Sequence, residues 1–139
     1  MSLDRVSGQP TWLLSRSHAR AQTILRDAWR SAGVRGYHYR LLAALDQYGT
    51  SSQADLARCT GIDRSDVVAA LNELVSHGWV GREPDPSDRR RNVVTLTDPG
   101  RRKLLALDTV LGDVQDEVLA PLTSTERQQL IVLLGKLVD

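Results

Sequence analysis

Cysteine, lysine and long apolar runs are the features that this sequence has least of, and each shortage excludes something. A single cysteine, Cys59, cannot form an intramolecular disulfide, which is typical of a protein kept in a reducing compartment. The longest apolar runs span only a few residues, so we predict no transmembrane helix and no membrane partner. Residues 1–10 are polar and lack the apolar core of a secretory signal. We therefore expect a cytoplasmic protein.

Motifs that would indicate an enzyme, a cofactor or a metal are also missing from the sequence. It contains no glycine-rich phosphate-binding loop, no GxSxG and no HExxH. The histidines His18, His38 and His77 lie far apart and lack the spacing of metal ligands. We therefore predict a protein that is not an enzyme and that has no cofactor and no metal site.

The basic residues are unevenly distributed, and lysine is absent from most of the chain. Residues 1–97 carry 13 Arg and 10 Asp or Glu, a balance of +3, whereas residues 98–139 carry 5 Lys or Arg and 7 Asp or Glu, a balance of −2. Arginine suits bidentate contacts to phosphate and guanine, but genomic base composition produces the same bias. The asymmetry permits a nucleic-acid-binding face without establishing one.

Apolar periodicity, together with residues that start and stop helices, predicts a mainly helical chain. Ser52, with Asp55 three residues later, is a capping-box variant that starts a short third helix. A turn near Cys59–Ile62 joins it to the fourth helix, which is the layout of a helix-turn-helix. The six predicted helices cover residues 11–32, 36–48, 52–60, 63–77, 98–120 and 123–137.

The period of the sequence changes after Gly78. WVGRE and NVVTLT are short β-type runs on either side of a turn rich in Pro and Asp, so residues 79–97 are predicted to form a β-hairpin. A helix-turn-helix followed by such a hairpin is a winged helix-turn-helix, whose second helix lies in the DNA major groove. The fold class we predict is mainly α with a small β-hairpin wing (α+β).

Three consecutive arginines, Arg89, Arg90 and Arg91, lie at the tip of the predicted wing. A charged turn in an arbitrary sequence is most often a solvated loop. At a wing tip, arginines have a physical role, because they neutralise phosphates or enter the narrow, electronegative minor groove. The helix-turn-helix before the hairpin therefore favours the functional interpretation.

The sequence resembles the multiple-antibiotic-resistance regulator (MarR) family of bacterial transcription factors over nearly its whole length. The segment LVSHGWV, which leads into the wing, is similar to the family's. The most specific resemblance is the wing pattern Asp-x-Arg followed by an apolar residue, Leu-Thr and a nearby glycine. Here that pattern is formed by Asp88, Arg90, Val94, Leu96, Thr97 and Gly100.

The resemblance implies a homodimer in which each subunit presents one winged helix to half of a near-palindromic operator in double-stranded DNA, most often as a repressor. It divides the chain into an N-terminal dimerisation helix (1–35), a DNA-binding lobe (36–100) and C-terminal dimerisation helices (101–139), intertwined as one domain. An apolar seam with spacings of 3, 4, 3 and 4 on residues 101–120 independently favours a partner surface. The predicted interface residues are Leu104, Leu107, Leu111, Val114, Leu130, Leu134 and Leu137.

The resemblance also assigns roles in DNA binding. The aspartate at position 88 of such a wing typically holds Arg90 by a salt bridge, and this arginine enters the minor groove. Arg89 and Arg91 either contact phosphate or remain solvated. The residues expected to contact DNA are Ser51, Ser52, Arg64, Ser65, Asp66, Ala69, Ala70, Asp88, Arg89, Arg90 and Arg91.

The chemistry of the fourth helix suggests how bases are recognised. Arg64 suits guanine, and an alanine suits a thymine methyl group. Asp66 either accepts a hydrogen bond from a cytosine amino group or only stabilises the helix N-terminus. Many members of the family carry hydroxyl residues and an arginine where this chain has Asp66, Val68 and Ala69, so the operator sequence cannot be carried over.

Members of the family often respond to small aromatic ligands. An aromatic wall with one cation suits an aryl carboxylate. The alternative is that these side chains pack at the dimer interface. The candidate lining residues are Trp12, Arg16, His18, Trp29, Tyr37 and His38.

Two other functions stay open on the sequence. One is a winged-helix protein-interaction module without DNA binding, against which the arginines of the wing argue. The other is a regulator that senses oxidants through Cys59. A lone cysteine at the end of the third helix is more often a small core residue, and the chain has no resolving cysteine.

Overall fold

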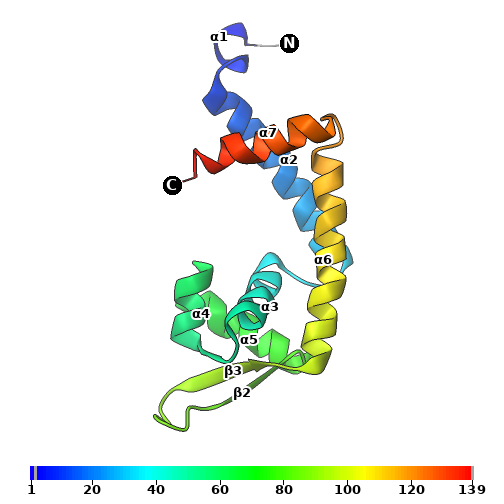
Figure 1. Cartoon of the computed structure of the whole chain (residues 1–139). Coiled ribbons are helices and arrows are strands. Elements are labelled where there is room, and N and C mark those ends of the chain that lie inside the picture. Colours follow the sequence, from blue (N-terminus) through cyan, green and yellow to red (C-terminus); the bar gives the residue numbers. More distant parts are fainter. Residues whose placement is uncertain (2, 139) are drawn as a thin grey trace. The chain divides into compact units, whose positions relative to one another are not determined.

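The computed structural model describes residue 1 and residues 3–138 and is mostly helical, with one small antiparallel sheet (Figure 1). The mainly α fold with a β-hairpin wing is therefore confirmed. No helix in the described part of the chain is both long enough and apolar enough to cross a membrane. The elements are α1 (Asp4–Ser7), α2 (Pro10–Ser31), α3 (Gly36–Tyr48), β1 (Ser51–Ser52), α4 (Gln53–Thr60), α5 (Arg64–Ser76), β2 (Val80–Pro84), β3 (Asn92–Leu96), α6 (Asp98–Val118) and α7 (Ser124–Gly135).

The chain divides into two compact units. We call Trp29–Val110 the winged unit, because it contains the helices α3, α4 and α5 and all three strands. We call Met1–Ala28 together with Leu111–Asp139 the terminal unit, because it is formed by the two ends of the chain. The helices α2 and α6 each contribute residues to both units.

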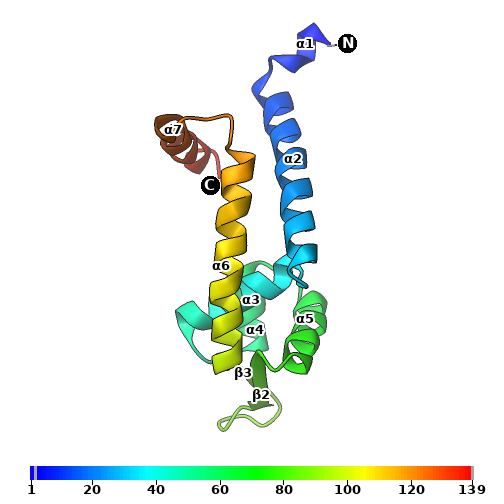
Figure 2. The same ribbon diagram turned by 90° about the vertical axis from the view of Figure 1, so that its right-hand side faces the viewer.

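The winged unit is held together by a core of aliphatic side chains. The helices α3, α4 and α5 gather on one side of the β2–β3 hairpin in both views (Figures 1 and 2). Tyr48 of α3 and Val75 of α5 lie outside this core, since Tyr48 is 63% exposed and Val75 is 38% exposed. The largest fully buried side chains are Leu41, Leu42, Leu45, Leu56, Val67, Leu71, Leu74, Val94 and Leu107.

The sheet has three strands in the order β1-β3-β2, one more than the predicted hairpin. β2 and β3 pair as expected, with Arg82 opposite Val94. The additional strand, β1, pairs Ser51 with Val94 and Ser52 with Val93. It could not be predicted because two serines carry no alternation of apolar and polar residues. β1 ties the start of α4 to the wing, so these two elements lie next to each other.

The junction between the wing and α6 explains the Leu-Thr and glycine of the sequence pattern. The Thr97 hydroxyl donates to the Gly78 carbonyl at 2.7 Å and accepts from the Gly100 N–H at 3.1 Å. A Cβ at position 100 would lie 1.9 Å from the Trp79 carbonyl oxygen, so only glycine fits there. These residues therefore fix where α6 leaves the wing and have no free group to offer a ligand at this point.

Polar contacts join helices of the terminal unit. Arg20 of α2 donates to the carbonyls of Val118 and Glu117, at 2.8 and 3.3 Å, where the last carbonyls of α6 lack helical partners. Thr123 and Glu126 form the predicted capping box at the start of α7. Val114 is the one buried apolar residue among the described residues of this unit.

Candidate nucleic-acid interface

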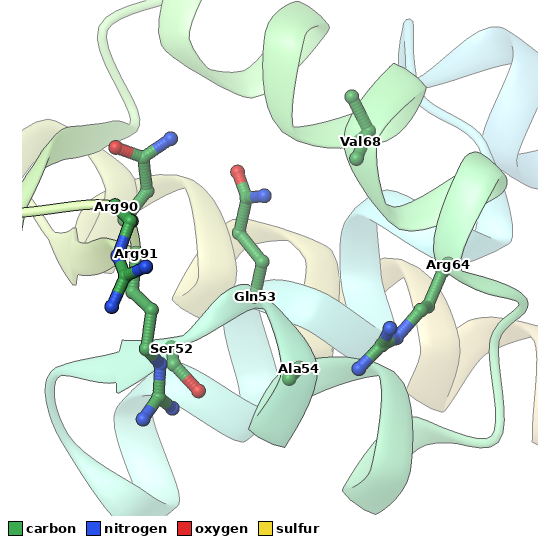
Figure 3. Close-up of a pocket in the computed structure, with 8 residues that line it drawn as sticks. Ser52, Gln53, Ala54, Arg64, Val68, Arg90 and Arg91 are labelled. Atoms are coloured by element: carbon green, nitrogen blue, oxygen red, sulfur yellow. The ribbon is translucent and has the colours of Figure 1, made fainter. Parts of the chain in front are cut away.

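A groove of about 240 Å³ lies on the winged unit between the start of α4, the outer face of α5 and the tip of the wing where β3 begins (Figure 3). Three of the residues that line it are arginines and none is acidic, so its electrostatic potential favours an anion. We call it the arginine groove. Its lining residues are Ser52, Gln53, Ala54, Arg64, Val68, Arg90, Arg91 and Asn92.

The helix α5 presents Arg64 and Val68 to the groove because its opposite face is buried. Asp63 caps the helix as predicted, and its carboxylate accepts from the Ser65 N–H at 3.2 Å. Hydrogen bonds from the hydroxyl and then the backbone of Ser65 lower the pKa of Asp63. Arg64 and Val68 lie one turn apart, and therefore on one face of the helix. Their side chains face the groove from the side opposite the wing (Figure 3).

One of the residues predicted to contact DNA is inaccessible. Ala70 is fully buried, because the helical period carries it into the core beside Val67 and Leu71. The expectation that it contacts a thymine methyl group is therefore wrong. Asp66 and Ala69 are exposed but do not line the groove, so their roles in DNA binding stay predictions.

The start of α4 is organised by hydrogen bonds within the protein. The Ser52 hydroxyl accepts from the Asp55 N–H at 3.1 Å, which confirms the predicted cap. The hydrogen bond with Ser52 is the first cause of the lowered pKa of Asp55, and Arg58 adds to it. The Ser51 hydroxyl donates to the Gly49 carbonyl at 2.9 Å. Both serine hydroxyls are engaged locally, so backbone N–H groups at this helix start are the better donors to a phosphate.

The tip of the wing is shaped by two aspartates. Asp85 accepts from the N–H and the hydroxyl of Ser87, at 2.9 and 2.8 Å, and the backbone bond is the first cause of its lowered pKa. Asp88 accepts from the Arg90 N–H at 3.1 Å, and its Oδ1 lies 3.5 Å from the Nε of Arg90. The Arg90 side chain is still 94% exposed. The pair therefore sets the direction of the arginine while leaving its guanidinium accessible.

The three wing arginines are not equivalent. Arg90 and Arg91 line the arginine groove and face it from the wing side (Figure 3). Arg89 is exposed but does not line the groove. The sequence could not distinguish them, because their side-chain directions depend on how the turn at Asp85–Asp88 closes.

Four lining residues were missed by sequence reasoning: Gln53, Ala54, Val68 and Asn92. The spacing of Val68 from Arg64 is a signal that could have found it, since residues four apart share a helix face. Gln53 and Ala54 follow the Ser52 cap directly and so lie in the first turn of α4. Asn92 starts β3, and only the pairing of β1 with β3 brings it near them.

Two of the candidate ligand-lining residues are committed to the core of the winged unit. Trp29 is 5% exposed, and its ring stacks on that of Tyr39 with centroids 5.1 Å apart. The Tyr39 hydroxyl donates to Asp108 at 2.6 Å, and this bond is the first cause that raises the pKa of Tyr39 to about 12. Trp29 is thus a packing residue in this unit.

His38 is the second of these core residues, and it links α3 to α5. Its Nδ1 accepts from the Arg35 N–H at 3.1 Å, and its Nε2 lies 2.7 Å from a carboxylate oxygen of Glu73, which also pairs with the Arg35 guanidinium. Burial lowers the pKa of His38, and the hydrogen bond to Glu73 opposes that shift only in part. His38 therefore lies inside a polar network, and its burial disfavours the charged imidazolium.

The other candidate ligand-lining residues lie nearer the surface. Arg40 lies over the ring of Tyr37, which is partly exposed, with 5.2 Å to the centroid. Trp12, Arg16 and His18 are exposed on α2 in the terminal unit, and Arg16 lies 5.9 Å from the centroid of Trp12. A shared ligand site for the six residues stays a prediction.

Cys59 is exposed, so the interpretation of this residue as a small core side chain is wrong. Its sulfur lies 3.6 Å from the Leu56 carbonyl, as expected for a residue near the end of a helix. The apolar face of α4 is carried by Leu56 instead, which is fully buried.

The predicted dimer-interface residues fall into two groups. Leu104, Leu107 and Val114 of α6 are buried within their own chain. These three residues of the seam therefore need no partner chain to shield them from solvent. Leu111 and Leu130 are partly exposed, whereas Leu134 and Leu137 are 37% and 68% exposed. Exposed apolar side chains that a second copy could cover lie on α7 and the adjoining C-terminal residues, and also on α2 at Trp12, Leu13 and Leu14.

The fold and the arginine groove define a winged helix-turn-helix DNA-binding protein. A family model described as "MarR family" matches residues 32–91, which span α3 to the tip of the wing. Over this segment the chain is similar to the MarR family of DNA-binding transcriptional regulators.

Similar proteins cover nearly the whole chain. The HTH-type transcriptional repressor NicR of Pseudomonas putida is 28% identical over 134 residues, 96% of this chain and 85% of NicR. A solved structure of Bordetella bronchiseptica BpsR, from work on the regulation of its DNA binding by 6-hydroxynicotinic acid, is 27% identical, with a TM-score of 0.80 over 96% of this chain and 95% of that one. Streptomyces coelicolor PcaV, solved in complex with its natural ligand, is 25% identical, with a TM-score of 0.77 over 100% and 98% of the two chains.

Proposed function

We propose that this chain acts in the cytoplasm as a homodimeric repressor, which binds a near-palindromic operator through its arginine groove and is released by a small aromatic ligand. The observation that carries the proposal is the convergence of Arg64 from α5 with Arg90 and Arg91 from the wing on one groove without acidic residues. The arginines of such a groove are suited to contact the phosphate backbone on either side of the helix that reads the bases.

The homodimer is supported by the apolar side chains on α7 and the residues after it. Ile131, Val132 and Leu133 are each 58–60% exposed, and Leu137 is 68% exposed. A helix with this much uncovered apolar surface at the end of a folded chain is typical of an association surface. A twofold dimer would present two copies of α5 about 34–36 Å apart, one helical turn of DNA.

The aromatic effector is supported by the relatives. The BpsR work names 6-hydroxynicotinic acid, an aromatic carboxylate, as the regulator of DNA binding by that protein. Within the terminal unit, Arg16 lies beside the indole ring of Trp12, and a cation next to an aromatic ring suits the same chemical class.

The experiment that tests the proposal is selection of operator DNA from a random duplex library with the purified chain. We expect enrichment of a near-palindrome, bound by two chains and with affinity that falls steeply with salt. Titration of the complex with 6-hydroxynicotinic acid and with benzoate then tests release. A folded chain that enriches no sequence at low salt would contradict the proposal, and enrichment of a single half-site by one chain would contradict the dimer.

A further inference from the structure

Arg82, on the base of the wing, connects the three elements that surround the arginine groove. It lies on β2 and is partly exposed. Its guanidinium donates to the side-chain oxygen of Asn72 on α5 at 2.7 Å and to that of Gln53 on α4 at 3.4 Å. Arg82 and Asn72 are not among the groove's lining residues, whereas Gln53 is. One arginine of the wing thus contacts both helices of the helix-turn-helix from behind the groove.

The contact with Arg82 fixes which way the Gln53 amide points. A guanidinium only donates hydrogen bonds, so the Gln53 atom that faces it must be the carbonyl oxygen Oε1. The amide nitrogen is then turned away from Arg82. The Gln53 side chain extends into the groove between the wing arginines and Val68 (Figure 3). A donor in this place meets an acceptor-rich surface when DNA enters, since phosphates and the major-groove edges of guanine, adenine and thymine all offer acceptors.

We propose that Arg82 is a positioning residue, which holds the Gln53 amide so that its nitrogen donates a hydrogen bond to DNA, and that Arg82 itself makes no phosphate contact. This inference rests on the proposed function of the arginine groove. It gives Arg82 a role that differs in kind from that of Arg90 or Arg91. The charged groups of those two side chains line the groove, whereas Arg82 donates hydrogen bonds to two neutral oxygens of its own chain.

Two consequences distinguish positioning from direct contact. An arginine that neutralises a phosphate releases counterions, so its removal lowers the slope of log affinity against log salt by about 0.9. Removal of a positioning arginine lowers the affinity and leaves that slope unchanged. In addition, an arginine that acts through Gln53 makes the two residues non-additive, because Gln53 contributes little once its amide is free to turn.

The test is a double-mutant cycle in full-length protein on the operator selected by the wild-type chain. We expect Arg82→Ala and Gln53→Ala each to weaken binding by about three- to tenfold, the worth of one hydrogen bond. The double variant should bind no more weakly than the weaker single variant, with the wild-type salt slope. Arg91→Ala, the matched arginine that lines the groove, should lower the slope. Additive losses, or a slope for Arg82→Ala that falls as it does for Arg91→Ala, would overturn the inference.

A second pair of variants covers the case in which Arg82→Ala disturbs the fold. Gln53→Glu keeps an oxygen for Arg82 and removes the donor, so it should bind DNA at least as weakly as Gln53→Ala while melting at the wild-type temperature. Asn72→Ala removes the other acceptor and should affect DNA binding less than Gln53→Ala. Wild-type affinity for Gln53→Glu would refute the inference. A wild-type chain that binds no DNA would contradict the proposed function as well, whereas additive variants of a wild type that binds would contradict only the role of Arg82.

Discussion

The two units of this chain differ in how they bury their apolar side chains. In the winged unit, leucines from four helices and a valine from the sheet are fully buried. In the terminal unit, Val114 alone is buried among the described residues, while large side chains from Trp12 to Leu14 and from Ile131 to Leu134 are exposed. The winged unit therefore has a buried apolar core of its own, whereas the terminal unit has an exposed apolar surface of the kind that the proposed dimer would cover.

The difference assigns separate physical tasks to the two units. A groove that must match the spacing of phosphates and bases has to be rigid, and the winged unit supplies rigidity through its core, its three-stranded sheet and the bridge from Arg82. A surface that joins two copies gains its stability from burying apolar area on association. Disruptive substitutions in the winged unit should consequently unfold the protein, whereas those on the surface of the terminal unit should dissociate the proposed dimer.

The largest effect is expected from a single methyl group at the junction of the wing with α6. Gly100→Ala would place a Cβ 1.9 Å from the Trp79 carbonyl oxygen, so we expect the free energy of unfolding to fall by more than about 4 kcal/mol, measured by chemical denaturation. The control is Gly112→Ala in the same helix, where a Cβ meets nothing within 4 Å, and which should stabilise by up to about 1 kcal/mol. Equal effects of the two substitutions would show that the junction is not tightly packed.

The next largest effect is expected on the exposed apolar surface of the terminal unit. Leu133→Asp combined with Leu137→Asp places two charges on one face of the C-terminal segment, where the native side chains are 58% and 68% exposed. We expect dimerisation to weaken by roughly a hundredfold or more, since anchors of an interface cost about 2 kcal/mol or more each. Sedimentation velocity measures the change, and near-native circular dichroism should show that the winged unit stays folded. The control carries the same charges at exposed polar positions, Gln128→Asp with Gln129→Asp; if it dissociates equally, the effect is only electrostatic.

A smaller effect distinguishes neighbouring arginines within the winged unit. Arg90→Ala removes a side chain that is held by Asp88 and lines the groove, so operator affinity should fall about tenfold and the salt slope by about 0.9. Arg89→Ala, which removes the same charge from a side chain outside the groove, should cost less than about threefold. Fluorescence anisotropy at several salt concentrations measures both, and indistinguishable variants would mean that the wing acts only as a diffuse positive charge.

The smallest expected effect is a pH dependence confined to the winged unit. Burial lowers the pKa of His38 below that of a free imidazole, about 6.5, so the unfolded chain takes up a proton more readily than the folded one. The contribution of His38 to the free energy of unfolding is fully present above pH 6.5 and is lost as the pH falls below that value. The melting temperature should therefore decrease on acidification from pH 7.5 to 5.5, and less so in His38→Gln. His18→Gln, at an exposed position, should melt with the wild-type pH dependence; the same dependence in His38→Gln would exclude His38 as the source.

Local signals in the sequence were sufficient for most of the fold. The caps at Ser52 and Asp63 and the glycines that end helices, such as Gly61 with its left-handed φ of 69°, are each decided by a few neighbouring residues. The wing was predictable because its two strands are adjacent in the chain. The two-residue strand β1 was not, since its pairing with β3 joins residues about forty positions apart.

The candidate site was predicted less completely, because its residues depend on tertiary geometry. Arg64, Arg90 and Arg91 were identified from their places in the helix-turn-helix and the wing. Whether Val68 or Ala70 faces the groove depends on the rotation of α5 about its axis, which packing against α3 decides. The hydrogen bond from Arg82 to Gln53 joins two residues that are distant in the sequence, so no local pattern predicts it.

The measurement that most directly tests the central claim is the salt dependence of operator affinity for the wild-type chain and for a variant with Arg64, Arg90 and Arg91 all replaced by alanine. We expect the triple variant to stay folded, to lose most of its affinity, and to have a salt slope lower by about 0.9 for each phosphate contact removed. An unchanged slope in a folded triple variant would contradict the account, because it would place the DNA-binding surface elsewhere on the molecule.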